Sequence, residues 1–252
     1  MTTRLLFIGM DHVQDAIHAL KYDDFLLGID STSIYYGPRD LDFDLLGKLE
    51  TAGINTRNFT VYQDVELINT TAHHTEFYKF GGWIAQQFVK LLAINACKDQ
   101  RILVQDCDTH LLKPYNFFTN TKTQPLVLHN ETHSPEYYSY IEKILGIPRQ
   151  THHCFVTEFM PITNKSWIAM VNRIEKLHNL DWFSAIYKIF DQDYKGPQIW
   201  FSEYELLGNW QLYQNPELTM YPQTRYESST WTDTPDPDHF NSYCMKPGDR
   251  HV

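Results

Sequence analysis

The stretch GGWIAQQFVKLLAINACKDQRILVQDCDTHLLKP, residues 81–114, decides the fold of this chain. Within it, residues 83–97 have apolar side chains near helical spacing after a glycine pair, and this pattern predicts a long helix. The short apolar run RILVQ, residues 101–105, follows at once and predicts a buried strand. That strand leads directly into Asp106-Cys107-Asp108. The stretch therefore predicts a helix, a buried strand and an acidic pair at the strand's carboxyl end.

The rest of the chain repeats this alternation of strands and helices. Further strands are expected at 4–9, 33–36, 59–62, 125–129 and 155–160, and further helices at 13–21, 43–52, 135–145, 164–177, 181–190 and 199–210. Such alternation is typical of an α/β fold built from right-handed crossovers. We therefore expect a mostly parallel sheet with helices on both faces and a loop-rich C-terminal end.

The composition narrows the classes of function. The 252 residues are 42% hydrophobic and 15% aromatic, which is typical of a globular protein, and the formal net charge is −10. This charge disfavours a nucleic-acid partner, which is usually bound by a basic surface. The four cysteines form no C-x-x-C pair, so neither a zinc knuckle nor a disulfide framework is indicated. Because no apolar run is long enough for a signal sequence or a membrane span, we expect a soluble cytoplasmic protein.

The acidic pair suits a divalent cation. In open α/β sheets, ligands bind beyond the carboxyl ends of the strands, where Asp106 and Asp108 are expected. If the backbone stays extended there, both side chains point the same way. Two carboxylates on one side suit Mg²⁺ or Mn²⁺ bound together with diphosphate oxygens. The same spacing recurs at 191–193 and 236–238, but in polar turns, so position selects the first pair.

Two further motifs accompany the acidic pair. The helix matches the pattern G-W-x-x-Q-Q-x-x-K-L through Gly82, Trp83, Gln86, Gln87, Lys90 and Leu91, and the segment F-S-E-Y-E occupies residues 201–205. With Asp106, Asp108 and Thr109 between them, the three motifs resemble GT-A fold glycosyltransferases, most closely a bacterial-type group that shares all three. In that group a histidine pair follows an F-V-T-like strand, whereas here Glu158 follows, and we expect it to accept hydrogen bonds instead.

The resemblance implies a function and a division of the chain. It implies a hexosyl- or pentosyltransferase that moves a sugar from a nucleoside diphosphate donor to a hydroxyl of a glycan or other acceptor. Mn²⁺ or Mg²⁺ would be the cofactor, with UDP the default nucleotide and GDP left open. A catalytic domain would span residues 1–222, with a nucleotide-binding half at about 1–114 and an acceptor half at about 115–222. Residues 223–252 would form a polar tail or flap.

The resemblance also suggests roles for single residues on the donor side. Trp83, Gln87 and Lys90 share one helical face, where Lys90 would hold a phosphate and Gln87 the sugar hydroxyls. The alternative is an ordinary surface face. Asp106 would contact the donor as well as the metal. Asp11, just past the first strand, would contact the nucleotide, or else cap the helix that begins at residue 13.

Glu203 and His239 complete the candidate site. Glu203 is the expected catalytic carboxylate, and in an inverting enzyme it would deprotonate the acceptor hydroxyl. The alternative is an acid in the first turn of a helix capped by Ser202. His239 is the expected third metal ligand, with His251 as its rival.

Three other classes of protein stay open at this point. Another metal-dependent phosphate-ester enzyme, such as a nucleotidyltransferase or nuclease, usually needs three or more acids to hold two metals. A glycosyltransferase acting on hydroxymethylated DNA bases would share every donor motif and differ only in its acceptor surface. A sugar-binding module would bind metal and donor without turnover.

Overall fold

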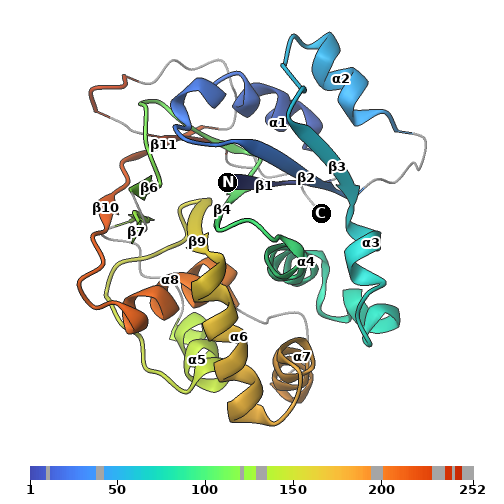
Figure 1. The fold of residues 1–252 in the computed structure, drawn as a ribbon, viewed down its shortest axis with the longest axis vertical. Coiled ribbons are helices and arrows are strands. Elements are labelled where there is room, and N and C mark those ends of the chain that lie inside the picture. The colour runs from blue at the N-terminus through green and yellow to red at the C-terminus, as the bar shows by residue number, and fades with distance from the viewer. Residues whose placement is uncertain are drawn as a thin grey trace.

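A five-stranded sheet forms the centre of the computed structural model, which describes residues 1–9, 12–37, 43–119, 122–128, 135–193, 201–228, 236–239 and 242–245. The strands are β1 (Thr2–Ile8), β2 (Ser31–Tyr36), β3 (Phe59–Gln63), β4 (Arg101–Asp106) and β9 (Phe159–Thr163), in the order β3-β2-β1-β4-β9 (Figure 1). The first four are parallel, and β9 runs antiparallel to β4. The expected α/β fold with a mostly parallel sheet is confirmed. The carboxyl ends of four strands consequently meet at one edge.

Helices cover both faces of this sheet because successive side chains of a strand point to opposite sides. Leu6, Ile8 and Ile34 pack with α1 (Val13–Leu20) and α2 (Leu45–Thr51) on one face. On the other face, Leu5, Phe7 and Tyr35 pack with α4 (Gly82–Ala96). Figure 1 shows α1 and α2 on the opposite side of the sheet from α4. Burial on both faces explains why LLFI in β1 and ILV in β4 read as continuous apolar runs.

A cluster of helices packs against α4 on the side away from the sheet. It consists of α5 (Pro135–Leu145), α6 (Asn164–His178), α7 (Trp182–Asp193) and α8 (Glu203–Gln214), in the lower part of Figure 1. Because α4 lies between the sheet and these helices, it is apolar nearly all round, as a buried helix must be. Two 3-10 helices, η1 (Asp23–Phe25) and η2 (His74–Phe80), and the short α3 (Asp64–Ile68) complete the helical elements described.

Smaller sheets join the later part of the chain to the segment after the acidic pair. Strand β5 (Thr109–Leu111) pairs with β12 (Ser242–Met245), which pairs in turn with β11 (Arg225–Ser228). Two short pairs, β6 (Phe118–Thr119) with β7 (Lys122–Thr123) and β8 (Leu126–Val127) with β10 (Tyr221–Pro222), lie elsewhere. The domain boundary at residue 222 stays a prediction, but described residues beyond it pair with the chain beside Asp108.

One expected strand begins later in the structure than predicted. A strand was expected at 155–160, but β9 begins only at Phe159. The reason is Glu158, whose φ of 58° lies in the left-handed region and turns the chain just before the strand. The backbone carbonyl of Glu158 accepts a hydrogen bond from the Asp106 amide at 3.1 Å. This turn brings the Glu158 side chain beside the acidic pair.

Candidate functional site

A cavity of about 330 Å³ lies where the order of the strands reverses, between β1 and β4. Ligands of open α/β sheets bind at this kind of switch point. The side chains expected at the site that line this cavity are those of Trp83, Gln87, Lys90, Asp106 and Asp108. The cavity is also lined by residues that were not expected to bind the donor or the metal, among them His12, Tyr137, Glu158 and Tyr204. The structure thus brings the helix motif and the acidic pair together around one space.

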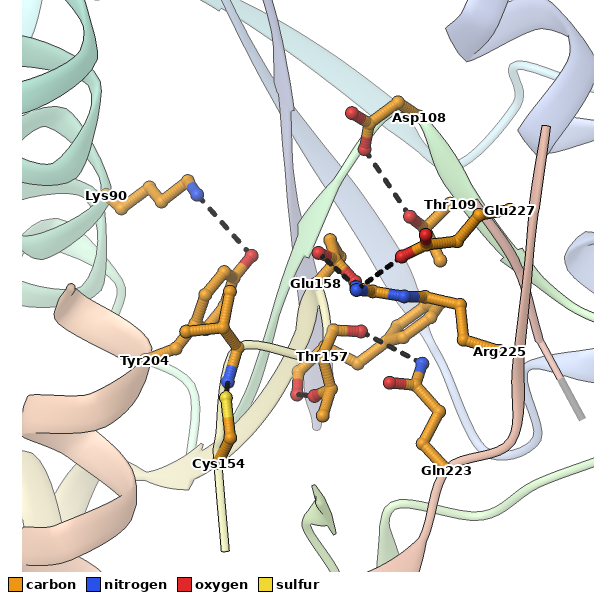
Figure 2. A network of polar contacts seen from close by, with 12 residues as sticks. Lys90, Asp108, Thr109, Cys154, Thr157, Glu158, Tyr204, Gln223, Arg225 and Glu227 are labelled. Atoms are coloured by element: carbon orange, nitrogen blue, oxygen red, sulfur yellow. Dashed lines mark hydrogen bonds and ion pairs between the residues drawn. The ribbon is translucent and has the colours of Figure 1, made fainter. Parts of the chain in front are cut away.

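Lys90 links the acidic pair to the F-S-E-Y-E segment. Its side chain is 1% exposed, and Nζ lies 2.6 Å from Asp106 Oδ1 and 2.7 Å from Glu203 Oε1. The same nitrogen lies 4.5 Å from the ring centroid of Tyr204 and 3.4 Å from its hydroxyl (Figure 2). Burial alone would lower the pKa of Lys90, but the two carboxylates more than offset this effect and raise it. Lys90 is therefore a buried cation that two acids share.

Glu203 is the second carboxylate paired with Lys90. It is the first residue of α8, capped by Ser202, whose hydroxyl accepts a hydrogen bond from the Glu205 amide at 3.3 Å. Its own amide donates to Gln87 Oε1 at 3.3 Å, and its side chain has no exposed surface. Burial raises the pKa of this carboxyl group, and Lys90 acts against that effect. The carboxylate of Glu203 does not line the cavity. The catalytic role expected of Glu203 stays a prediction.

Asp108 and Glu158 are two further acidic groups that line the cavity with Asp106. Burial and the charge of Asp106 raise the pKa of Asp108 to about 6, against the opposing effects of His12 and Lys90. Burial also raises the pKa of Glu158, to about 8, although Arg225 opposes it. Nη1 of Arg225 donates to both carboxylate oxygens of Glu158 at 2.8 Å (Figure 2). A third carboxylate thus lies at this cavity, already paired with an arginine from β11.

The acidic pair fits a divalent cation. Its members are hard oxygen donors that line one cavity, and the charge of Asp106 adds to the larger effect of burial in raising the pKa of Asp108. Across the described ranges, no three His, Cys, Asp or Glu side chains gather so that they could hold a metal ion. A cation bound by Asp106 and Asp108 would therefore complete its coordination with oxygens of water or of a ligand.

One expected metal ligand is not brought to the pair. The imidazole of His239 is 77% exposed, and its Nδ1 lies 2.7 Å from Oδ2 of Asp236. Because His239 does not line the cavity, its role as a metal ligand stays a prediction. Asp11 lies outside the described residues, as does His251. The neighbour of Asp11, His12, does line the cavity, and its Nδ1 lies 2.7 Å from Asp15.

An aromatic cavity of about 550 Å³ continues from the first one. Both are lined by Phe7, Gly9, His12, Trp83 and Gln86. Strand register aligns Asp106, Phe7, Tyr35 and Tyr62 in one row across β4, β1, β2 and β3. The rings of Phe7 and Tyr35 stack at 5.3 Å, and those of Tyr35 and Tyr62 at 5.2 Å. The acidic pair therefore lies at one end of an aromatic row, beside a cavity suited to a flat ring.

The fold is that of a glycosyltransferase structure. The apo crystal structure of mouse xyloside xylosyltransferase 1 matches with a TM-score of 0.51 over 98% of each chain, at 12% sequence identity. By sequence, the chain belongs to DUF6492, a family of unknown function whose pattern matches residues 44–234. No curated protein matches the sequence. Within the described ranges, no helix is both long enough and apolar enough to cross a membrane.

Proposed function

We propose that this protein is a metal-dependent glycosyltransferase that moves a sugar from a nucleoside diphosphate donor to a hydroxyl of a glycan or other acceptor. The observation that supports this most is the position of Asp106 and Asp108, which line one cavity at the switch point beside an aromatic cavity. The fold shared with a xylosyltransferase agrees with the proposal. UDP is the expected nucleotide by resemblance, with GDP as the alternative.

The two joined cavities match the two ends of such a donor. The acids would hold Mn²⁺ or Mg²⁺ and, through it, the diphosphate, while the aromatic cavity would take the nucleoside. Trp83 and Gln86 line both cavities and would contact the donor between its ends. When bound, the metal would supply Lewis-acid stabilisation of the negative charge that develops on the departing diphosphate.

The buried ion pairs of Lys90 with Asp106 and Glu203 would hold Asp106 in position for the metal. Lys90 fixes one oxygen of Asp106, and this carboxylate would meet the cation in the cavity that it lines. Glu203 forms an ion pair with Lys90 and has no exposed surface. We therefore assign it a positioning role in place of the expected contact with the acceptor. A carboxylate held in place before its ligand arrives needs little reorganisation during the reaction.

Turnover of a panel of nucleotide sugars with and without Mn²⁺ or Mg²⁺ tests the proposal. The wild type should hydrolyse or transfer at least one donor with release of the nucleoside diphosphate, and Asp108→Ala should lose this activity. Asp193→Ala is the matched control, because it alters another D-x-D triplet that lies at the end of α7. Release of a nucleoside monophosphate would identify a phosphate-ester enzyme instead. No turnover and no metal-dependent nucleotide binding would contradict the proposal.

A further inference from the structure

One carboxylate oxygen of Asp64 has no hydrogen-bond partner among the described residues. This residue follows directly on β3, begins α3, and lines the aromatic cavity with Tyr35 and Tyr78. Its Oδ1 atom is buried and makes no hydrogen bond in the described structure. Burial raises the pKa of this carboxyl group to about 6. Because an unpaired buried polar group is costly, a partner for this oxygen is expected from a ligand.

The lining of the aromatic cavity offers this carboxylate no strong cation. No lysine or arginine occurs among the described residues that line it. Apolar and aromatic groups such as Val65, Val89 and Trp83 line the same cavity. The nearby hydroxyls of Tyr35 and Tyr78 have raised pKa values, in which burial is the main cause and the charge of Asp64 contributes. The cavity therefore suits a flat, uncharged ring that donates a hydrogen bond.

We propose that Asp64 selects the base of the donor nucleotide by accepting a hydrogen bond from a ring N–H. This inference rests on the proposed function. An ionised carboxylate only accepts hydrogen bonds. Uracil N3 and guanine N1 carry a hydrogen, whereas cytosine N3 and adenine N1 present a lone pair that the carboxylate repels. The ring nitrogen therefore favours uracil or guanine, whereas cytosine and adenine could donate to this carboxylate only through an exocyclic amino group.

Calorimetric titration of UDP, GDP, CDP and ADP, each with Mn²⁺, tests this selection. Whichever of UDP and GDP binds better should bind at least about tenfold more tightly than CDP or ADP, because it makes one more hydrogen bond to a buried charge. Comparison of UDP with GDP shows which ring N–H is used. Asp64→Asn offers an amide donor as well as an acceptor, so it should reduce the preference to within about threefold.

Two controls separate base selection from a general loss of structure. Glu66→Gln changes an exposed carboxylate on the same helix that does not line the aromatic cavity, and it should keep the preference. Binding of Mn²⁺ with inorganic pyrophosphate should be the same in the wild type and Asp64→Asn. Equal affinity of the wild type for all four nucleotides, or a full preference in Asp64→Asn, overturns the inference while pyrophosphate binding leaves the proposed function intact. Failure of both nucleotides and pyrophosphate to bind overturns both.

Discussion

Lys90 Nζ lies 2.6 Å from Asp106 Oδ1, and this contact ties the middle of α4 to the last residue of β4. The same nitrogen lies 2.7 Å from Glu203 Oε1 at the start of α8. One buried lysine therefore links the helix before the acidic pair, the strand that ends in it and a helix far along the chain. The position of Asp106 depends on all three elements.

Removal of this cation should destabilise the fold. Lys90→Met leaves Asp106 and Glu203 near each other without the cation that pairs with both, which should lower the free energy of unfolding by about 3–5 kcal/mol. Addition of Glu203→Gln should restore part of that loss. Lys79→Met is the control, because Lys79 forms an exposed pair with Asp191 worth less than about 1 kcal/mol. Urea unfolding measures all three, and equal losses in both single variants would contradict the assignment.

Gly208 should tolerate no side chain. A Cβ atom there would lie 2.2 Å from Cγ of Phe155, a fully buried ring. Gly208→Ala should therefore lower the free energy of unfolding by at least about 1–3 kcal/mol. At Gly82, also helical, a Cβ atom would meet nothing within 4 Å. Gly82→Ala should be neutral or stabilise by up to about 1 kcal/mol, and thermal unfolding of both variants checks the contrast.

His110 should make the fold sensitive to acid. Its ring is buried and stacks on Tyr22 at 3.9 Å, and burial, with a contribution from His18, lowers its pKa to about 3 from 6.5. Between these values the unfolded chain binds the extra proton, so stability is complete above about pH 6.5 and falls as pH decreases toward 3. From pH 7 to pH 5, His110 should account for a loss of about 2 kcal/mol.

Comparison with His110→Gln isolates this effect. Asp64, Asp108 and Glu158 have raised pKa values, so their ionisation acts on stability with the opposite sign, but equally in both proteins. Urea unfolding at the two pH values should show a smaller acid loss in the variant. The same loss in both proteins would show that His110 is not buried in its neutral form.

Arg225 and Glu158 should be energetically coupled. Arg225→Gln removes the arginine paired with Glu158 near Asp108 and also removes a partner of Glu227, which lies 2.7 Å from Nη2. It should destabilise more than Glu158→Gln, after which Arg225 keeps Glu227. A double-mutant cycle by urea unfolding should give a coupling energy of about 1–3 kcal/mol. Additive single effects would mean that β11 does not pack against the site as described.

Local sequence patterns predicted the framework of the site well. Helical spacing placed Trp83, Gln87 and Lys90 on one face, and the structure places all three at one cavity. The buried run before Asp106 distinguished its triplet from Asp191-Gln192-Asp193, which lies at the end of α7 with its acids paired to Lys79 and Lys143. Helical spacing identifies which residues share a face of a helix, and this was enough to place these three together.

Local sequence patterns could not predict which distant residues these side chains contact. Spacing places Lys90 on a face of α4 but does not specify a contact with Glu203, which is more than a hundred residues away. The pairing of β5 with β12 joins strands of three and four residues, too short to leave a clear period. Asp64 reads as an ordinary acid at the start of a helix, and only the cavity around it indicates a ligand.

Binding of Mn²⁺, followed by the EPR signal of the free ion in the presence of UDP or GDP, tests the central claim most directly. The wild type should bind one Mn²⁺ whose affinity rises when the nucleotide is added, because the diphosphate completes its coordination. Asp108→Asn should weaken this binding at least about tenfold, whereas Asp193→Asn, in the triplet at the end of α7, should leave it unchanged. Equal Mn²⁺ affinity in the wild type and Asp108→Asn would contradict the assignment of Asp106 and Asp108 as the metal site.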